Sequence, residues 1–293
     1  MIMDDIEKVT ENPEASVHLK SGLYVVATPI GNLRDISLRA LEVLRNCDVI
    51  MCEDTRVTRK LLNAYQIKGK LCPYNDHSDD ARRQYIVDQV KGGQVVALVS
   101  DAGMPLISDP GYKLVRDCEE GGVYVTTIPG ASAPLAALQI SGLPSDRFCF
   151  IGFLPHKTNA RKKLLSQWCE VPGTLIAFET APRLLASLQD IDSALGVREV
   201  AVVREITKLY EEVRKGSPSD LCSHYEKEGL PRGEIVLVIS PPEDVEITDD
   251  EVFDMIRDAL KSMRTKDAAA FVAEKVGRKK NDLYDIALQI SKE

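Results

Sequence analysis

The residues best suited to chemistry lie in four loops, each of which follows a strand-like run. The loops are ATPIGN (27–32), CEDTR (52–56), SDAGMPLISDPG (100–111) and PGASAP (129–134). The Gly and Pro residues of ATPIGN, SDAGMPLISDPG and PGASAP favour fixed turns that hold backbone N–H and C=O groups in set directions. We therefore expect a ligand that is bound through many backbone hydrogen bonds. The GxGxxG dinucleotide loop and the GxxxxGK[ST] phosphate loop are both missing from the sequence, which disfavours a dehydrogenase and a P-loop enzyme.

The PGASAP loop suits a ligand that carries a carboxylate. Its small residues Ala131, Ser132 and Ala133 let a ligand approach the backbone closely. A helix that begins here offers free N–H groups and a partial positive charge. This loop therefore indicates a site for the carboxylate of an amino-acid moiety.

Two of the other loops also have plainer interpretations. Asp54 or Thr55 suits the N-cap of the helix that follows CEDTR. Acidic side chains beside Thr55 and Arg56 equally suit a polar cluster that orients a substrate, so both interpretations stay open. The Ser-Asp-Pro run at residues 108–110 forms a good helix start, which leaves the earlier part of that loop unexplained.

The elements that position these loops alternate between strands and helices. Strand-like runs lie at 23–28, 49–52, 95–100 and 123–128, with a weaker one at 70–74, and each is followed by an amphipathic stretch. This alternation predicts an α/β fold with a mostly parallel sheet and helices on both faces. Ligands of such sheets bind outside the carboxyl ends of the strands, where the four loops lie.

The second half of the chain predicts a mixed sheet. Its expected strands are 148–154, 174–178, 199–206, 209–214 and 234–240. Its expected helices are 159–168, 182–195 and 218–228. Residues 204–215 suit a hairpin or a bent pair of strands, which would place antiparallel strands in this sheet.

These elements divide the chain into four segments. Residues 1–20 form an acidic extension, 21–142 an α/β domain with a mostly parallel sheet, 146–242 an α/β domain with a mixed sheet, and 248–293 a small helical domain. The last domain is expected to contain helices at 249–262, 266–276 and 281–291. Gly277 suits the end of the middle helix.

Composition narrows the class of protein. The 293 residues carry a net charge of −8, which argues against a protein that coats nucleic acid through bulk charge but leaves room for a local basic patch. Seven scattered cysteines without a CxxC pair indicate reduced thiols and no metal site. No apolar run approaches the roughly 20 residues that span a bilayer, and the first residues lack a secretory signal. We expect a cytoplasmic protein without a metal or a membrane partner.

Taken together, the four loops closely resemble those of the tetrapyrrole-methylase superfamily. CEDTR and SDAGMPLISDPG are the specific strings, and they look like the branch of ribosomal RNA small subunit methyltransferases I, which methylate a cytidine 2′-oxygen of 16S rRNA in the small ribosomal subunit. The likeness runs from Leu23 to Ser240 and continues into a helix-turn-helix-like tail. It implies a two-domain class III methyltransferase fold with S-adenosylmethionine in the cleft between the domains, and a homodimer.

The resemblance also assigns site residues. Cofactor contacts carried over from the family's motifs fall on Pro29, Asp101, Met104, Ile107, Ser132 and Ala133, on Ala177 or Phe178, and on Gly233 within RGEIV. A ribose hydroxyl is a poor nucleophile, so a base or hydrogen-bond acceptor is needed. The candidates are Glu53, Asp54, His77 and Asp101, of which Asp101 is rather assigned to the cofactor. We expect Asp54→Ala to abolish methylation, whereas His77 is as readily structural as catalytic.

Basic side chains are expected on the RNA side of the site. Arg34 and Arg56 suit the phosphates that flank the target ribose. Further basic residues cluster after the first strand of the second half, namely Lys157, Arg161, Lys162 and Lys163. A solvated helix face is the ordinary interpretation of this cluster, and phosphate contact is the alternative. Residues 278–280 form a second basic patch in the tail, where packing is the ordinary role and RNA docking the alternative.

Two rival functions stay open. A methylase of a small tetrapyrrole of the uroporphyrinogen or precorrin type would share the fold and also bind a polyanion, but the long SDAGMPLISDPG loop and the helical tail favour RNA. A non-enzymatic ribosome-assembly protein would bind RNA without needing four ordered loops at strand ends. Binding of S-adenosylmethionine separates this second rival from an enzyme.

Overall fold

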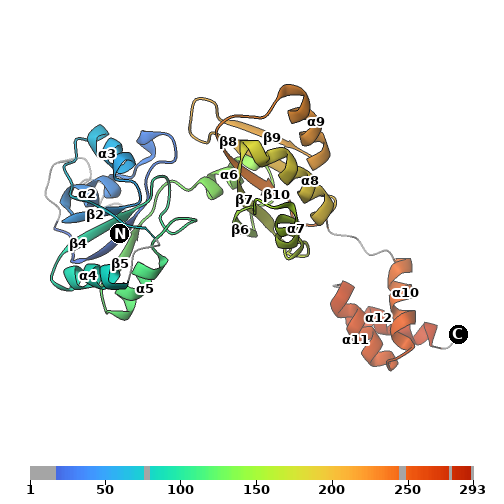
Figure 1. Cartoon of the computed structure of the whole chain (residues 1–293). Coiled ribbons are helices and arrows are strands. Elements are labelled where there is room, and N and C mark those ends of the chain that lie inside the picture. The colour runs from blue at the N-terminus through green and yellow to red at the C-terminus, as the bar shows by residue number, and fades with distance from the viewer. Residues whose placement is uncertain (1–17, 76–79, 244–248, 277–278, 292–293) are drawn as a thin grey trace, which may run out of the picture. The chain divides into compact units, whose positions relative to one another are not determined.

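The computed structural model describes residues 18–75, 80–243, 249–276 and 279–291. The chain divides into two compact units, Met1–Pro242 and Glu243–Glu293. The first unit contains two five-stranded sheets, and the second contains three helices (Figure 1).

The first sheet has the order β3-β2-β4-β1-β5, and all of its strand pairs are parallel. Its strands are β1 (Gly22–Val26), β2 (Val49–Cys52), β3 (Leu71–Pro73), β4 (Val95–Val99) and β5 (Val125–Ile128). Every residue of β4 is buried, as expected for a parallel strand that is covered on both faces. The predicted parallel sheet is confirmed.

Helices cover both faces of this sheet, because successive strand residues point to opposite sides. Val99 of β4 belongs to the apolar cluster under α2 and α3, whereas the residue before it, Leu98, belongs to the cluster under α4 and α5. The bounds are η1 (Leu33–Asp35), α2 (Leu38–Asn46), α3 (Thr55–Ala64), α4 (Asp80–Lys91) and α5 (Tyr112–Glu120). β1, β2 and β4 each end in a loop that leads into a helix covering this sheet.

The second sheet has the order β6-β7-β10-β8-β9 and is mixed, as predicted. β6 and β7 are parallel, whereas the other pairs are antiparallel, including the predicted hairpin of β8 and β9. Its strands are β6 (Phe148–Phe153), β7 (Thr174–Thr180), β8 (Val200–Arg204), β9 (Glu212–Gly216) and β10 (Glu234–Ile239). One face carries α7 (Thr158–Ser166), η2 (Ala181–Arg183), α8 (Leu184–Leu195) and α9 (Pro218–Glu228).

The other face of the second sheet is covered by α6 (Ala133–Ser141), the helix that follows PGASAP (Figure 1). Ala137 and Leu138 of α6 pack with Ile176, Ala201 and Val238 of the sheet. This helix lies before residue 142, where the sequence suggested that the first domain ends. The loop that precedes α6 therefore joins one sheet to the covering helix of the other.

Two local predictions are wrong. The strand expected at 209–214 is β9, which begins only at Glu212, because Glu205 and Thr207 adopt positive φ and the chain turns there. The helix expected to start at 108–110 is α5, which begins at Tyr112 with Gly111 as its N-cap. Leu106 and Ser108 also adopt positive φ, so the end of SDAGMPLISDPG is a series of turns and not a helix start.

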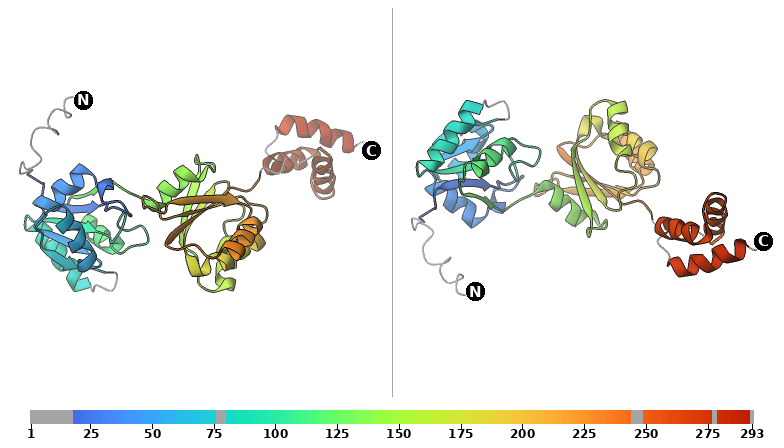
Figure 2. Two further views of the ribbon diagram at one scale, coloured as in Figure 1. Left: turned by 90° about the horizontal axis from the view of Figure 1, so that it is seen from above. Right: turned by 90° about the horizontal axis from the view of Figure 1, so that it is seen from below.

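The second unit is a three-helix bundle with its own core (Figure 2). Its helices are α10 (Asp249–Leu260), α11 (Thr265–Val276) and α12 (Lys280–Ile290). Val252, Ile256, Ala269, Val272 and Leu283 are fully buried between them. Gly277, the predicted end of the middle helix, lies outside the described residues, as do Arg278 and residues 1–17.

None of the described helices is long and apolar enough to cross a membrane. The part of the chain that the structure describes also holds no group of three or more His, Cys, Asp or Glu side chains placed to bind a metal ion.

Candidate active site

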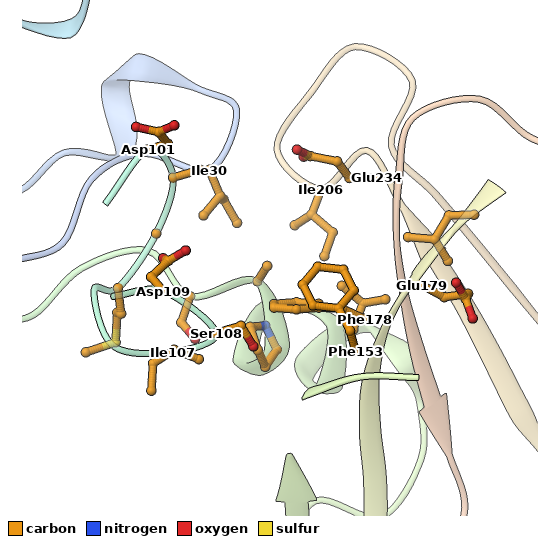
Figure 3. Close-up of a pocket in the computed structure, with 18 of the residues that line it drawn as sticks. Ile30, Asp101, Ile107, Ser108, Asp109, Phe153, Phe178, Glu179, Ile206 and Glu234 are labelled. Carbon is orange, nitrogen blue, oxygen red and sulfur yellow. The ribbon is translucent and has the colours of Figure 1, made fainter. Parts of the chain in front are cut away.

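A cavity of about 380 Å³ in the first unit, called the main cavity below, is lined by loops at the ends of the first sheet and by residues of the second sheet (Figure 3). Seven of the predicted cofactor residues line it, namely Asp101, Met104, Ile107, Ser132, Ala133, Phe178 and Gly233. Its volume lies in the range of about 300–1,000 Å³ that small-molecule sites occupy. The structure thus brings together loops that lie more than 100 residues apart in the sequence.

Two predicted cofactor residues lie elsewhere. Ala177 is fully buried on the opposite face of β7, in the cluster under α8, so its side chain is remote from the cavity wall. Phe178 is the member of that pair that faces the cavity, because the two residues alternate along the strand. Pro29 lines an adjoining, smaller cavity.

Backbone hydrogen bonds tie the first and third loops to each other. The Thr28 N–H donates to the Gly103 carbonyl over 2.9 Å, and the Gly103 N–H donates back to Thr28 over 3.1 Å. The Ser100 hydroxyl also donates to Gly103, over 3.1 Å. The Asp54 N–H donates to Asp101 Oδ1 over 3.1 Å, which adds the second loop. The wall of the cavity is therefore set by main-chain geometry.

The first loop also contacts the second half of the unit. The Asn32 N–H donates to Thr207 Oγ1 over 3.1 Å. A Cβ on Gly31 would lie 2.6 Å from Cγ of Lys208, a distance that real Cβ atoms do not reach. Gly31 is thus required because the turn after β8 approaches the backbone of the first loop.

The second-sheet side of the cavity is largely apolar. Phe153 and Phe178 lie against each other with ring centroids 5.1 Å apart, and both line the cavity (Figure 3). Ile206 and Val236 extend this wall. Such a wall suits a flat heterocycle, which aromatic rings bind by stacking.

Carboxylates line both sides of the cavity, with Glu179 and Glu234 on the second sheet and Asp101 and Asp109 in the loop after β4, and the sequence analysis did not single out Asp109. Asp109 is half-buried in the cavity wall. Burial, together with the charges of Glu53 and Asp101 and against a lowering by a hydrogen bond to Ser100, raises the pKa of its carboxyl to about 6. A carboxyl with such a pKa exchanges protons near neutral pH. The sequence analysis interpreted the Ser-Asp-Pro run as a helix start and therefore did not consider Asp109 as a group that exchanges protons.

Asp54, the preferred catalytic candidate, is used for structure. It is the N-cap of α3, and its Oδ1 accepts a hydrogen bond from the Arg56 N–H over 2.8 Å. Its carboxylate also pairs with the Arg56 guanidinium, with Nη2 2.6 Å from Oδ2. The hydrogen bonds from Arg56 lower the pKa of Asp54 to about 2. The capping interpretation is confirmed, and a carboxylate this acidic is a weak base.

The remaining candidates for base and phosphate contact differ in their positions. Glu53 is exposed beside Asp54 and lies near enough to Asp109 to raise its pKa. Arg34 is exposed on η1. Arg56 has an 87% exposed side chain that is already paired with Asp54. His77 lies outside the described residues.

The basic cluster on α7 is only partly available to a ligand. Arg161 is 1% exposed, and its Nε donates to Asp190 Oδ2 over 2.8 Å while Nη1 donates to the Pro155 carbonyl over 3.1 Å. Arg161 is therefore a core residue, and its assignment to a phosphate is wrong. Lys162 lies 3.6 Å from Asp190, and Lys157 is exposed at the N-cap of the helix.

Solved structures with the same fold are methyltransferases and a synthase. A diphthine synthase superposes with a TM-score of 0.59 at 17% identity over 74% of this chain and 89% of that chain. A cobalt precorrin-4 methyltransferase gives a TM-score of 0.55 at 17% identity over 74% and 94%. The profile of the tetrapyrrole (corrin/porphyrin) methylases matches residues 22–222. The fold and the loops are thus those of a class III methyltransferase.

Relatives with higher sequence identity indicate the branch of this superfamily to which the chain belongs. A ribosomal RNA small subunit methyltransferase I of Erythrobacter litoralis is 52% identical over 93% of this chain and 96% of its own. One from Escherichia coli O157:H7 is 44% identical over 91% and 94%. The RsmI C-terminal HTH domain matches residues 246–291. The chain belongs to the ribosomal RNA small subunit methyltransferase I family.

Proposed function

We propose that the protein transfers a methyl group from S-adenosylmethionine to the 2′-oxygen of a cytidine ribose in 16S rRNA. The observation that carries this proposal is a cavity lined by three of the four loops, through residues such as Ile30, Asp101 and Ser132, and by the second sheet. A uroporphyrin-III C-methyltransferase from Thermus thermophilus with a TM-score of 0.52 and 18% identity was solved with S-adenosyl homocysteine. That complex supports the choice of donor.

The cavity residues fit S-adenosylmethionine. Ser132 is the N-cap of α6 but makes no capping hydrogen bond with its side chain, which leaves the first turn open to the donor's carboxylate. Phe153 and Phe178 suit the adenine ring. Asp101 and Asp109 suit positive charge on the donor. When bound, S-adenosylmethionine supplies a methyl group on a cationic sulfur, whose transfer to a ribose oxygen leaves S-adenosylhomocysteine and one proton.

Asp109 is our candidate for the group that accepts this proton. Its raised pKa means that it is anionic near neutral pH but less acidic than an ordinary aspartate. The group faces the cavity, and the turns at Leu106 and Ser108 fix its place in the wall. Glu53 then acts on Asp109 through its charge, and Asp101 remains a cofactor contact that also holds the Asp54 N–H.

Several partner assignments belong to the same proposal. Arg34, Arg56, Lys157 and Lys162 are proposed to contact RNA phosphates outside the cavity, which none of them lines. We also propose a cytoplasmic homodimer. Exposed apolar side chains such as Leu209, which is 88% exposed, and Tyr210, which is 67% exposed, support a protein partner on this surface.

The test is to incubate the protein with labelled S-adenosylmethionine and unmodified small ribosomal subunits, and to map the labelled nucleotide. We expect one 2′-O-methylated cytidine. Label transferred to uroporphyrinogen III and not to RNA would favour the tetrapyrrole rival. Absence of S-adenosylmethionine binding in calorimetry would favour a non-enzymatic assembly protein.

A further inference from the structure

A second cavity of about 310 Å³ adjoins the main one and has no role in the proposal for the donor. The two cavities share four lining residues, namely Ile30, Asp101, Ala102 and Glu234. Figure 3 shows Ile30, Asp101 and Glu234 together at one end of the main cavity. A ligand in the second cavity would therefore meet a donor in the first across this shared wall.

The outer wall of the second cavity comes from one face of α3. Val57, Lys60 and Leu61 have the spacing i, i+3, i+4 and line the cavity together. Leu33 of η1 adds a fourth side chain, and the Tyr65 hydroxyl from the end of α3 donates to its carbonyl. Val57 is 38% exposed and Leu33 47% exposed, so an apolar surface faces outward without a partner from the described residues.

The α3 side of this cavity carries basic side chains. Lys60 is exposed on the lining face, and among the described residues no carboxylate pairs with it. Arg56 and Arg59 directly precede Val57 and Lys60 on α3 and are also exposed, although Arg56 is paired with Asp54. Lys208 lines the opposite wall, where its Nζ lies 2.9 Å from Glu205 and 2.8 Å from Glu234. Because Asp101 and Glu234 also line the cavity and Lys208 is paired, the basic side chains that remain beside the apolar hollow are concentrated on α3.

An apolar hollow with cations at its rim fits a nucleoside whose base is turned out of the RNA. Enzymes that modify nucleotides take up the base in a pocket and hold the flanking phosphates with basic side chains. A ribose must also reach the donor from a connected space, in line with the bond that breaks. We propose that the second cavity binds the target nucleoside of the RNA acceptor, with Val57, Leu61 and Leu33 against the base and Lys60 at a flanking phosphate. This inference rests on the proposed function.

The first test uses a variant whose larger side chain fills the second cavity and leaves the donor site intact. Val57→Trp should lower kcat/KM for small ribosomal subunits by about a hundredfold, the loss expected when an acceptor is misplaced by about 1 Å. Its affinity for S-adenosylhomocysteine in calorimetry should equal that of the unchanged protein. Val197→Trp is the matched control, because Val197 is 76% exposed and lines neither cavity. A Val57→Trp protein that folds, binds S-adenosylhomocysteine and methylates at the normal rate would overturn the inference.

A second variant, with a smaller expected effect, tests the role of the Lys60 charge. Lys60→Ala should reduce the salt dependence of RNA binding by about one in the slope of log K against log salt, the effect of losing one phosphate contact. Lys227→Ala, at an 84% exposed side chain of α9, should leave the slope unchanged. An unchanged slope for Lys60→Ala would contradict the placement of the phosphate. If the unchanged protein methylates no RNA at all, the proposed function itself fails, and this outcome differs from each of the others.

Discussion

Two acidic loops lie on neighbouring strands of the first sheet, and their aspartates are held in opposite states. Asp54 follows β2, is paired with an exposed arginine and has a pKa near 2 because of that pairing. Asp109 comes after β4, is half-buried near Glu53 and has a pKa near 6 because of burial. Both sequences looked like helix starts. The comparison teaches that the partner of a carboxylate and its burial, rather than its place at a strand end, decide between a structural and a catalytic role.

Removal of the Asp109 carboxylate should have the largest effect. Asp109→Asn keeps the shape of the side chain but cannot take up the proton, so we expect turnover to fall by about 10²–10⁴-fold. Single-turnover methylation of small ribosomal subunits measures this loss. Asp146→Asn, at a 78% exposed side chain, is the matched control. A rate within a factor of about three of the normal one, well below the usual contribution of a general base, would remove Asp109 from the mechanism.

Loss of the buried ion pair between Arg161 and Asp190 should have the next largest effect. We expect this effect on stability and not on turnover. Arg161→Ala leaves Asp190 buried without its main partner, because Asp190 is only 5% exposed. Breaking one partner of a buried pair costs about 3–5 kcal/mol of unfolding free energy. Urea denaturation followed by circular dichroism measures it. An Arg161→Ala protein of normal stability but poor RNA binding would restore the phosphate role that the structure argues against.

Glu53→Gln tests the comparison of the two loops through the pH dependence of the methylation rate. The charge of Glu53 raises the pKa of Asp109, so its removal should lower that pKa and move the acid limb of the rate profile to lower pH. The maximal rate at high pH should change little. Glu170→Gln, at an exposed residue outside both cavities, provides the control. A shift to higher pH would show that Glu53 and Asp109 do not interact as described.

Replacement of Asp54 should have the smallest effect on chemistry. Asp54→Ala removes the cap of α3 and releases Arg56, so the midpoint of thermal unfolding should fall slightly. Methylation should fall by less than about tenfold, because a general base would account for far more. This expectation replaces the earlier one, drawn from the sequence, that the variant is inactive. An inactive Asp54→Ala protein with normal donor binding would reverse the roles of the two loops.

The sequence was a sufficient guide to the sheets and to most of the cofactor loops. VVALVS predicted a strand buried on both faces because only a covered parallel strand tolerates such a run, and β4 is that strand. Asp101, Met104 and Ser132 were assigned through the resemblance of their loops to the family's motifs, and all three line the cavity. These features follow from local patterns that the fold preserves.

Other features depended on contacts that the sequence does not display. Arg161 looked like part of a solvated basic face, but its ion pair with Asp190, 29 residues away, draws it into the core. The strand predicted at 209–214 begins three residues later because Thr207 is held in a turn, where its hydroxyl accepts the N–H of Asn32. The pKa of Asp109 arises from burial and from Glu53, and neither can be read from residues 108–110 alone.

The pH dependence of single-turnover methylation tests the central claim most directly. With saturating S-adenosylmethionine and small ribosomal subunits, the account predicts a rate that is level above pH 7, half-maximal near pH 6 and about tenfold lower for each further unit of acidity, because Asp109 must be deprotonated to act. The half-maximal point should disappear in Asp109→Asn. A rate that stays constant down to pH 5 in the unchanged protein would contradict the assignment.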